Sequence, residues 1–145
     1  MFMLNELLIK DLSEQVGINT SDIQNIKDGE IYSTSEIKTN KKWIDGKPIY
    51  RKTIDCGKLL GSDTVKSVAH NISNIDLITD RKAFGYISTG NKMTFDIPFG
   101  GNTSAMFNGA FASARADNTF VYLVVHGDLT TYSAYMTLEY TKTTD

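Results

Sequence analysis

The chain changes character at Ile31, and this change limits the folds that it can adopt. Beyond this point the helical period disappears, and Thr, Ser, Val, Tyr and Phe dominate between glycine-containing turns. Segments with the composition of strands are residues 65–72, 83–88, 92–99, 118–127 and 132–142, and segments typical of turns are residues 79–82, 88–92, 99–104, 114–118 and 126–131. Because no helical pattern separates these strands, the sequence predicts a mainly β protein, an antiparallel, jelly-roll-like β-sandwich.

Two of the predicted strands alternate strictly between two sets of side chains. In residues 93–99 the apolar set is Met93, Phe95, Ile97 and Phe99. In residues 135–140 one set is Met136, Leu138 and Tyr140, and the other is Tyr135, Thr137 and Glu139. Because successive side chains of a strand point to opposite faces, these strands should bury one face and leave the other to solvent.

The first 29 residues have a helical period, and we expect residues 3–28 to form one longer and one short helix. An apolar stripe with polar side chains opposite it consists of Leu4, Leu8, Leu12 and Val16. One such stripe buries little surface alone, so it must pack on the rest of the chain, on a copy of itself or on another protein. We therefore expect a helical anchor and oligomer interface at residues 1–29 and a β-sandwich display domain at residues 30–145.

Composition argues against several classes of function. The chain has 145 residues, the size of one ordinary domain, and a formal net charge of −2 with a pI of about 5.6. This balance argues against a nucleic-acid partner and against binding to an anionic membrane. No stretch approaches the roughly 20 apolar residues of a membrane span, and the N-terminus lacks the positive region of a secretion signal. We expect neither membrane insertion nor export through a cleaved signal.

Charged residues become sparse after Ala83, where Thr, Ser, Asn, Tyr and Gly supply most of the polar surface. A monomer usually carries more surface charge. This surface fits burial in an oligomer, contact with neutral sugars, or simply a polar surface without charge.

The segment at residues 43–57, WIDGKPIYRKTIDCG, predicts a hairpin. Asp45-Gly46 favours a type I′ turn, in which both residues have positive φ. We interpret Trp43 as a cross-strand cover for this hairpin and not as a ligand platform. Neither face of the strand that follows is purely apolar, which indicates an edge strand or a twisted hairpin.

Several segments resemble a C-terminal module of tailed-phage structural proteins. They are YSTSE at residues 32–36, WIDGKPIY at 43–50, KTI at 52–54, HNISNID at 70–76 and LEYTK at 138–142. The block from Trp43 to Tyr50 is the distinctive part. Such proteins are tail fibre, head fibre or minor structural proteins of phages of Gram-positive and gut bacteria. The resemblance covers about residues 30–145 and implies an all-β virion module, commonly trimeric, that carries no catalytic residues.

Candidate ligand-binding side chains lie in three predicted loops, at residues 100–104, 115–118 and 127–132. The side chains that could hydrogen-bond to a sugar or stack on it are Asn102, Arg115, Asp117, Asn118 and Tyr132. The second of these loops can also be read as an ordinary Asx turn.

No spacing of nucleophile, base or metal ligands stands out. The chain has two histidines, His70 and His126, and one cysteine, Cys56, which excludes an internal disulfide and a multi-cysteine zinc site. Carboxylate pairs could be drawn from Asp96, Asp117, Asp128 and Glu139, as in many β proteins. We expect no catalytic residues, no metal and no cofactor.

Together these patterns predict a structural protein of a phage virion, made in the host cytoplasm. It would be a head- or tail-attached fibre or decoration protein, most simply a homotrimer. The N-terminal helices would contact other virion proteins, and the displayed β domain could bind a host-surface glycan. The alternatives are a carbohydrate-binding adhesion module and a small glycan-degrading enzyme.

Overall fold

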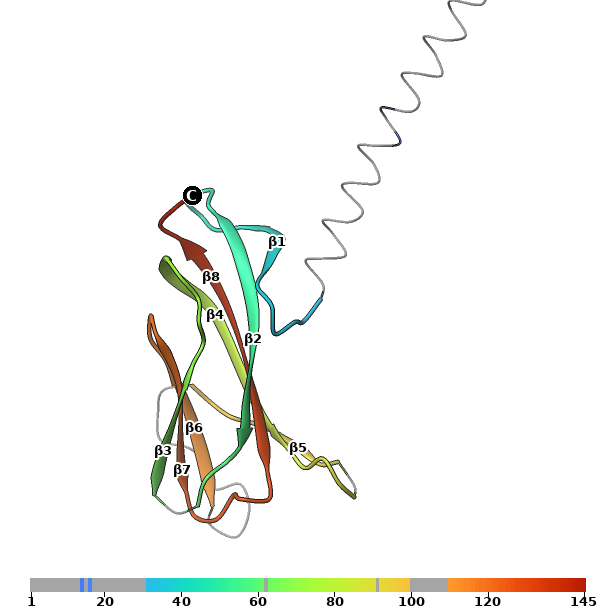
Figure 1. Cartoon of the computed structure of the whole chain (residues 1–145), viewed down its shortest axis with the longest axis vertical. Coiled ribbons are helices and arrows are strands. Elements are labelled where there is room, and N and C mark those ends of the chain that lie inside the picture. The colour runs from blue at the N-terminus through green and yellow to red at the C-terminus, as the bar shows by residue number, and fades with distance from the viewer. Residues whose placement is uncertain (1–13, 15, 17–30, 62, 91, 100–109) are drawn as a thin grey trace, which may run out of the picture.

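The computed structural model describes residues 31–61, 63–90, 92–99 and 110–145, together with Glu14 and Val16 (Figure 1). Glu14 and Val16 are helical and exposed. The other residues of the predicted anchor stripe, Leu4, Leu8 and Leu12, lie outside the described residues. No helix in the described part of the chain is long and apolar enough to cross a membrane.

The described residues form two antiparallel β-sheets (Figure 1). The strands are β1 (Ile37–Lys42), β2 (Pro48–Lys58), β3 (Thr64–Ala69), β4 (Ile75–Tyr86), β5 (Thr94–Asp96), β6 (Phe111–Ala116), β7 (Phe120–His126) and β8 (Ser133–Lys142). The larger sheet has the order β1-β2-β8-β4-β5, and the smaller sheet has the order β3-β7-β6. The prediction of a mainly β, antiparallel chain is confirmed.

One hydrophobic core receives side chains from both sheets. From β8 it receives Ala134, Met136, Leu138 and Tyr140, and from β7 it receives Val121, Leu123 and Val125, all of them fully buried. Burial of each larger apolar side chain contributes about 1.5–3 kcal/mol. The buried set expected in residues 135–140 is therefore confirmed, although Glu139 of the opposite set is buried as well. In β5 and its continuation Phe95 and Ile97 are buried as predicted, whereas Met93, expected on the same side, is 39% exposed.

One predicted turn is wrong, and a second begins later than predicted. Residues 79–82 lie inside β4, where irregular pairing between Ile78 and Asp80 lets the strand continue past polar residues. Residues 114–116 of the predicted turn at 114–118 belong to β6, so Arg115 is a strand residue, paired with Tyr122 of β7. In both places exposed charged side chains on a strand, such as Asp80, Lys82 and Arg115, resemble the composition of a turn.

The Trp43 hairpin is confirmed, but its turn type differs from the prediction. The backbone N–H of Gly46 donates to the Trp43 carbonyl at 2.9 Å, and the Trp43 N–H donates to the Lys47 carbonyl at 2.9 Å. Gly46 has a φ of +87°, whereas Asp45 is not among the residues with positive φ. This is a three-residue loop that ends on a left-handed glycine. Trp43 is half-buried and lies outside the core.

The strand after this hairpin is not at an edge. β2 pairs with β1 on one side and with β8 on the other. Its mixed faces have a different cause: Arg51 is buried on the outer face because it pairs with Glu139 of β8.

One end of the described unit is joined by polar contacts between distant segments, and we call it the interlocked end. It consists of Glu36, the hairpin at residues 43–47, the connection at residues 70–76 and the C-terminal residues 139–145. Lys47 forms an ion pair with Asp76, and Glu36 accepts hydrogen bonds from Lys142 and the Tyr140 hydroxyl, both at 2.6 Å. Burial, assisted by Glu36, raises the pKa of Tyr140.

The opposite end is joined by apolar side chains, and we call it the loop end. Leu59 and Leu129 are almost fully buried there. The Leu59 N–H donates to the Tyr132 carbonyl at 2.8 Å, which ties the β2–β3 connection to the β7–β8 loop. The Tyr132 ring packs edge-on against Phe95, with ring centroids 5.0 Å apart.

Candidate functional site

The outer face of the larger sheet carries aligned rows of side chains, because residues directly opposite in antiparallel strands share a face. One row runs from Lys82 of β4 through Thr137 of β8 to Thr53 of β2. The next row pairs Phe84 with Tyr135. Three strands distant in sequence thus place hydroxyl groups and aromatic rings next to each other.

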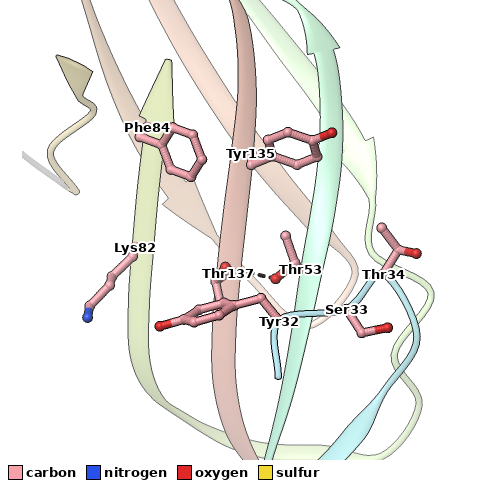
Figure 2. Close-up of a pocket in the computed structure, with 8 residues that line it drawn as sticks. All are labelled: Tyr32, Ser33, Thr34, Thr53, Lys82, Phe84, Tyr135 and Thr137. Carbon is pink, nitrogen blue, oxygen red and sulfur yellow. Dashed lines mark hydrogen bonds between the residues drawn. The ribbon is translucent and has the colours of Figure 1, made fainter. Parts of the chain in front are cut away.

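A groove of about 530 Å³ lies over these rows, and Figure 2 shows the side chains around it. They are Tyr32, Ser33, Thr34, Thr53, Lys82, Phe84, Tyr135 and Thr137. The Thr53 and Thr137 hydroxyls are 3.0 Å apart and hydrogen-bond to each other. Each hydroxyl oxygen can accept two hydrogen bonds and donate one, so this pair keeps capacity for a ligand.

One side of the groove is the segment that leads to β1. The Thr53 N–H donates to the Ser33 carbonyl at 2.8 Å, which fixes this segment beside β2. The Arg51 guanidinium carbon lies 4.9 Å from the centroid of the Tyr32 ring, within the range of a cation–π contact. Tyr32 is therefore held over the sheet through Arg51.

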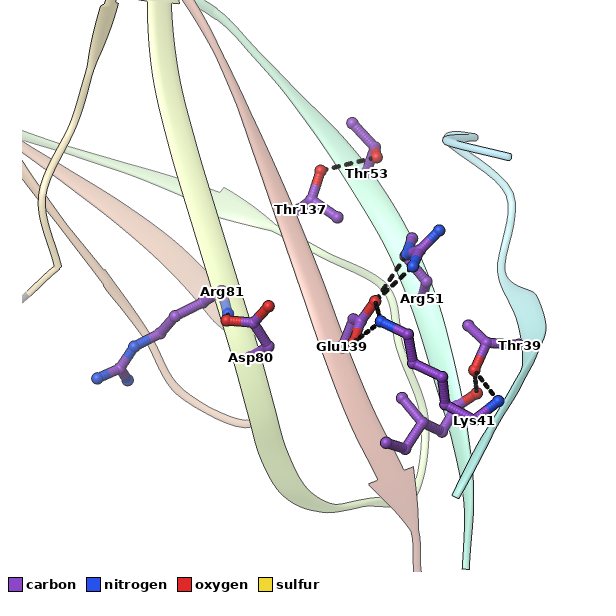
Figure 3. Close-up of polar contacts among 9 residues, drawn as sticks. Thr39, Lys41, Arg51, Thr53, Asp80, Arg81, Thr137 and Glu139 are labelled. Atoms are coloured by element: carbon purple, nitrogen blue, oxygen red, sulfur yellow. Dashed lines mark hydrogen bonds and ion pairs between the residues drawn. The ribbon is translucent and has the colours of Figure 1, made fainter. Parts of the chain in front are cut away.

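Arg51 is itself fixed by a buried ion pair on the outer face, shown in Figure 3. Its Nε and Nη2 atoms donate to the Glu139 Oε1 atom at 2.9 and 2.6 Å. Lys41 of β1 adds contacts to both Glu139 oxygens at 3.3 and 3.4 Å. Two cations thus satisfy one carboxylate, and the arrangement gives the Tyr32 side of the groove a rigid base.

The other side of the groove is an aromatic cluster. Tyr135 and Tyr86 stack with centroids 5.4 Å apart and planes 6° apart, and Phe84 lies 5.9 Å from Tyr135. A hydrogen bond with Tyr86 raises the pKa of Tyr135, so the Tyr135 hydroxyl stays protonated at neutral pH. Phe84 is 39% exposed, so part of its ring faces the groove.

A second hollow of about 410 Å³ adjoins this groove along the same face. It shares Phe84 and Tyr135 with the first hollow and is otherwise lined by Tyr86, Ile87, Ser88, Lys92 and Thr94. The two hollows therefore lie on either side of one aromatic pair. Together they form an elongated track, which we call the aromatic track.

The predicted sugar-binding residues do not form one site. Asn102 lies outside the described residues. Arg115 lies on β6, and Asp117 and Asn118 lie in the turn that joins β6 to β7, whereas Tyr132 follows β7, at its other end. Because β7 has seven residues, about 20 Å separates the two loops.

The turn at Asp117 is the Asx turn that the sequence left open as the simpler reading. The Asp117 Oδ1 atom accepts hydrogen bonds from the Thr119 and Phe120 N–H groups at 2.8 and 2.7 Å, and Oδ2 accepts one from the Tyr122 hydroxyl at 2.6 Å. The Tyr122 hydrogen bond and the two backbone donors lower the pKa of Asp117 to about 2. This carboxylate is already committed to the turn.

The prediction for Tyr132 is wrong. Its side chain is buried at the loop end and packs on Phe95, so the ring offers no face to a sugar. The apolar partner that covers it comes from β5, far away in the sequence. Arg115 and Asn118 are exposed, as a binding role would require.

The histidines and the cysteine have structural surroundings. His70 Nε2 donates to the Asp117 carbonyl, and its Nδ1 accepts from the Ile72 N–H, both at 3.1 Å. Burial lowers the pKa of His70. Burial also raises the pKa of the Cys56 thiol to about 11, which makes it a poor nucleophile at neutral pH. The His126 Nδ1 atom lies within hydrogen-bond distance of the Asp63 Oδ1 atom, at 2.7 Å.

The acidic residues considered for catalysis are dispersed over the unit. Asp96 is on β5, Asp117 is in the β6–β7 turn, Asp128 is in the β7–β8 loop, and Glu139 is paired with Arg51. Hydrogen bonds from Thr130 lower the pKa of Asp128. Within the described residues, no group of three or more His, Cys, Asp or Glu side chains could hold a metal ion.

The aromatic track was missed from the sequence, although part of its signal was visible. Alternation placed Tyr135, Thr137 and Glu139 on one face of a strand, yet their neighbours on β2 and β4 depend on register. Comparison of the chain with family models, curated proteins and solved structures gave no match.

Proposed function

We propose that this chain is a fibre-type or decoration protein of a tailed-phage virion. Its β unit would be a jelly-roll-like sandwich that assembles as a homotrimer and is displayed on the particle. Residues 1–29 would form the helical anchor to other virion proteins. No catalytic step, metal or cofactor is part of this proposal.

The observation that supports it is the convergence of the phage-like segments at the interlocked end. Glu36 of the first segment contacts Tyr140 and Lys142 of the last. Lys47 of the tryptophan segment contacts Asp76 of the histidine segment. The residues that carry the resemblance therefore hold the fold together, as expected if the resemblance reflects a shared architecture and not a shared active site.

The strand order also supports the jelly-roll-like reading. The chain crosses between the sheets from β2 to β3, from β3 to β4, from β5 to β6 and from β7 to β8, which brings β2, β8 and β4 side by side and pairs β3 with β7. Crossings of this kind are typical of double-sheet jelly rolls, which many virion proteins use.

The test is immunogold labelling of particles from the phage that encodes the chain, with antibodies against the full-length protein. We expect label at one position on intact particles and the trimer mass in light scattering of the purified chain. A fragment of residues 30–145 should fold but fail to join particles in which the full chain is replaced. Unlabelled particles, in a preparation where a known capsid protein is labelled, would refute the virion proposal.

A further inference from the structure

We propose that the aromatic track is a binding site for a linear chain of neutral pyranose sugars. It consists of the groove between Tyr32 and the Phe84–Tyr135 pair and the adjoining hollow beside Tyr86. This proposal rests on the proposed function in one respect, which is that the sugar would belong to a host surface. The class of ligand is argued from the side chains that line the track.

The walls of the track match the two kinds of surface on a pyranose ring. A sugar ring has faces of C–H groups, which carry partial positive charge and pack favourably on the negative faces of aromatic rings. Tyr32, Phe84 and Tyr135 supply such rings on opposite sides of the groove. Three rings gathered around one groove form a cluster of the kind that ligand-binding grooves use.

The polar groups of the groove suit the hydroxyl edge of the same ring. The linked hydroxyls of Thr53 and Thr137, 3.0 Å apart, can both accept and donate hydrogen bonds. No carboxylate lines the groove, and Lys82 is its one charged lining residue. The second hollow adds one more ammonium, that of Lys92, and again no carboxylate. Hydroxyl groups that both donate and accept suit a polyol, whereas a cationic ligand would lack a carboxylate partner among these lining residues.

The shape of the track indicates a chain and not a single sugar. The two hollows of about 530 and 410 Å³ share Phe84 and Tyr135, so a ligand that fills both must pass over this pair. Sugar units on either side would then each contact an aromatic ring. A site of this form would bind internal units of a polysaccharide.

The track is also largely pre-formed, which reduces the entropic cost of binding. Tyr32 is held by Arg51, and Arg51 is held by Glu139. Tyr135 is stacked on Tyr86 at 5.4 Å. Tyr32 and Tyr135 thus have partners within the chain that favour the orientation seen in the track.

The experiment uses the full-length chain and a set of linear tetrasaccharides of glucose, N-acetylglucosamine, mannose and galactose, each titrated by calorimetry. We expect at least one to bind, with an affinity that changes little between low and high salt. Phe84→Ala and Tyr135→Ala should each weaken that binding about tenfold. Tyr135→Phe, which keeps the ring, should bind nearly as well as the native chain and covers the case in which Tyr135→Ala does not fold.

The matched control is Phe120→Ala. Phe120 is 36% exposed, close to the 39% of Phe84, but it lies on β7 of the smaller sheet. This variant should bind the sugar like the native chain.

Three outcomes would overturn the proposal: binding of none of the sugars, equal losses with Phe84→Ala and Phe120→Ala, or dissociation of an oligomer by Phe84→Ala. The last would identify the track as an interface between copies. Particle labelling is independent of this titration, so failure of the sugar site and failure of the virion proposal are distinguishable.

Discussion

The two ends of the β unit close the same pair of sheets with different chemistry. At the interlocked end, charged and hydroxyl groups join segments up to 106 residues apart, as in the contact between Glu36 and Lys142. At the loop end, the segments are joined by buried side chains, those of Leu59, Leu129 and Tyr132. Polar closure depends on pH and salt, whereas apolar closure depends on packing, so the two ends should respond to different perturbations.

The largest effect should come from breaking the buried ion pair beside the interlocked end. Glu139→Ala leaves Arg51 buried without its carboxylate, and we expect a loss of about 3–5 kcal/mol in the free energy of unfolding, measured with urea. The double variant Arg51→Met with Glu139→Met should lose much less, because neither charge remains. Equal destabilisation of the single and double variants would contradict this, because it would mean that the unpaired Arg51 charge adds no cost to the free energy of unfolding.

A somewhat smaller effect is expected from the loop end. Leu129 is 1% exposed, and Leu129→Ala should lower the free energy of unfolding by about 3 kcal/mol through lost burial and a cavity. The loss should be the same at low and high salt. A loss that shrank strongly with added salt would mean that the loop end is not closed by apolar packing alone.

The third test uses pH and concerns His70, which joins the 70–76 connection to the β6–β7 turn. Burial lowers the pKa of His70 in the folded state, so the unfolded state takes up the proton first. The contribution of neutral His70 is therefore complete above about pH 6.5 and decreases as the pH falls toward the folded-state pKa.

Urea unfolding at pH 7.5 and 5.5 measures this dependence, with His70→Gln compared with the native chain. The His70 variant should lose part of the decrease in stability between the two pH values. An unchanged pH dependence in the His70 variant would show that other groups cause it.

The smallest effect is expected at the surface of the interlocked end. The hydrogen bond to Asp76 raises the pKa of Lys47, but both side chains are partly solvated. Lys47→Met should change the melting temperature only slightly, and the change should vanish at high salt. A large decrease that persists in high salt would show that this pair is as important as the buried one.

Much of the scaffold was predictable because it depends on local patterns. Alternation identified the buried side of β8 through Met136, Leu138 and Tyr140, and Asp45-Gly46 located the first hairpin. The turn type was wrong because Asp-Gly also fits a three-residue loop in which Gly46 alone is left-handed. Residues 79–82 were misread because charged residues on the solvent side of a strand look like a turn.

The candidate site was not predictable in the same way. Thr53, Phe84 and Tyr135 come together only through the register of β2, β8 and β4, and no local pattern sets this register. Likewise, the mixed polar and apolar faces of β2 are typical of an edge strand when the sequence is read alone. The residue that pairs with Arg51 is Glu139, which lies 88 residues away and which no local pattern identifies. Tyr132 lies in a loop, and its burial depends on Phe95, which is distant in the sequence.

The buried thiol of Cys56 gives this chain a built-in reporter of its own opening. It is the single cysteine in the sequence, it lies on β2 beside β8 at the centre of the larger sheet, and its pKa of about 11 keeps it unreactive in the closed state. A thiol reagent can therefore label it only during moments when these strands separate. The labelling rate would report how often an assembled or glycan-bound chain opens, without any engineered probe.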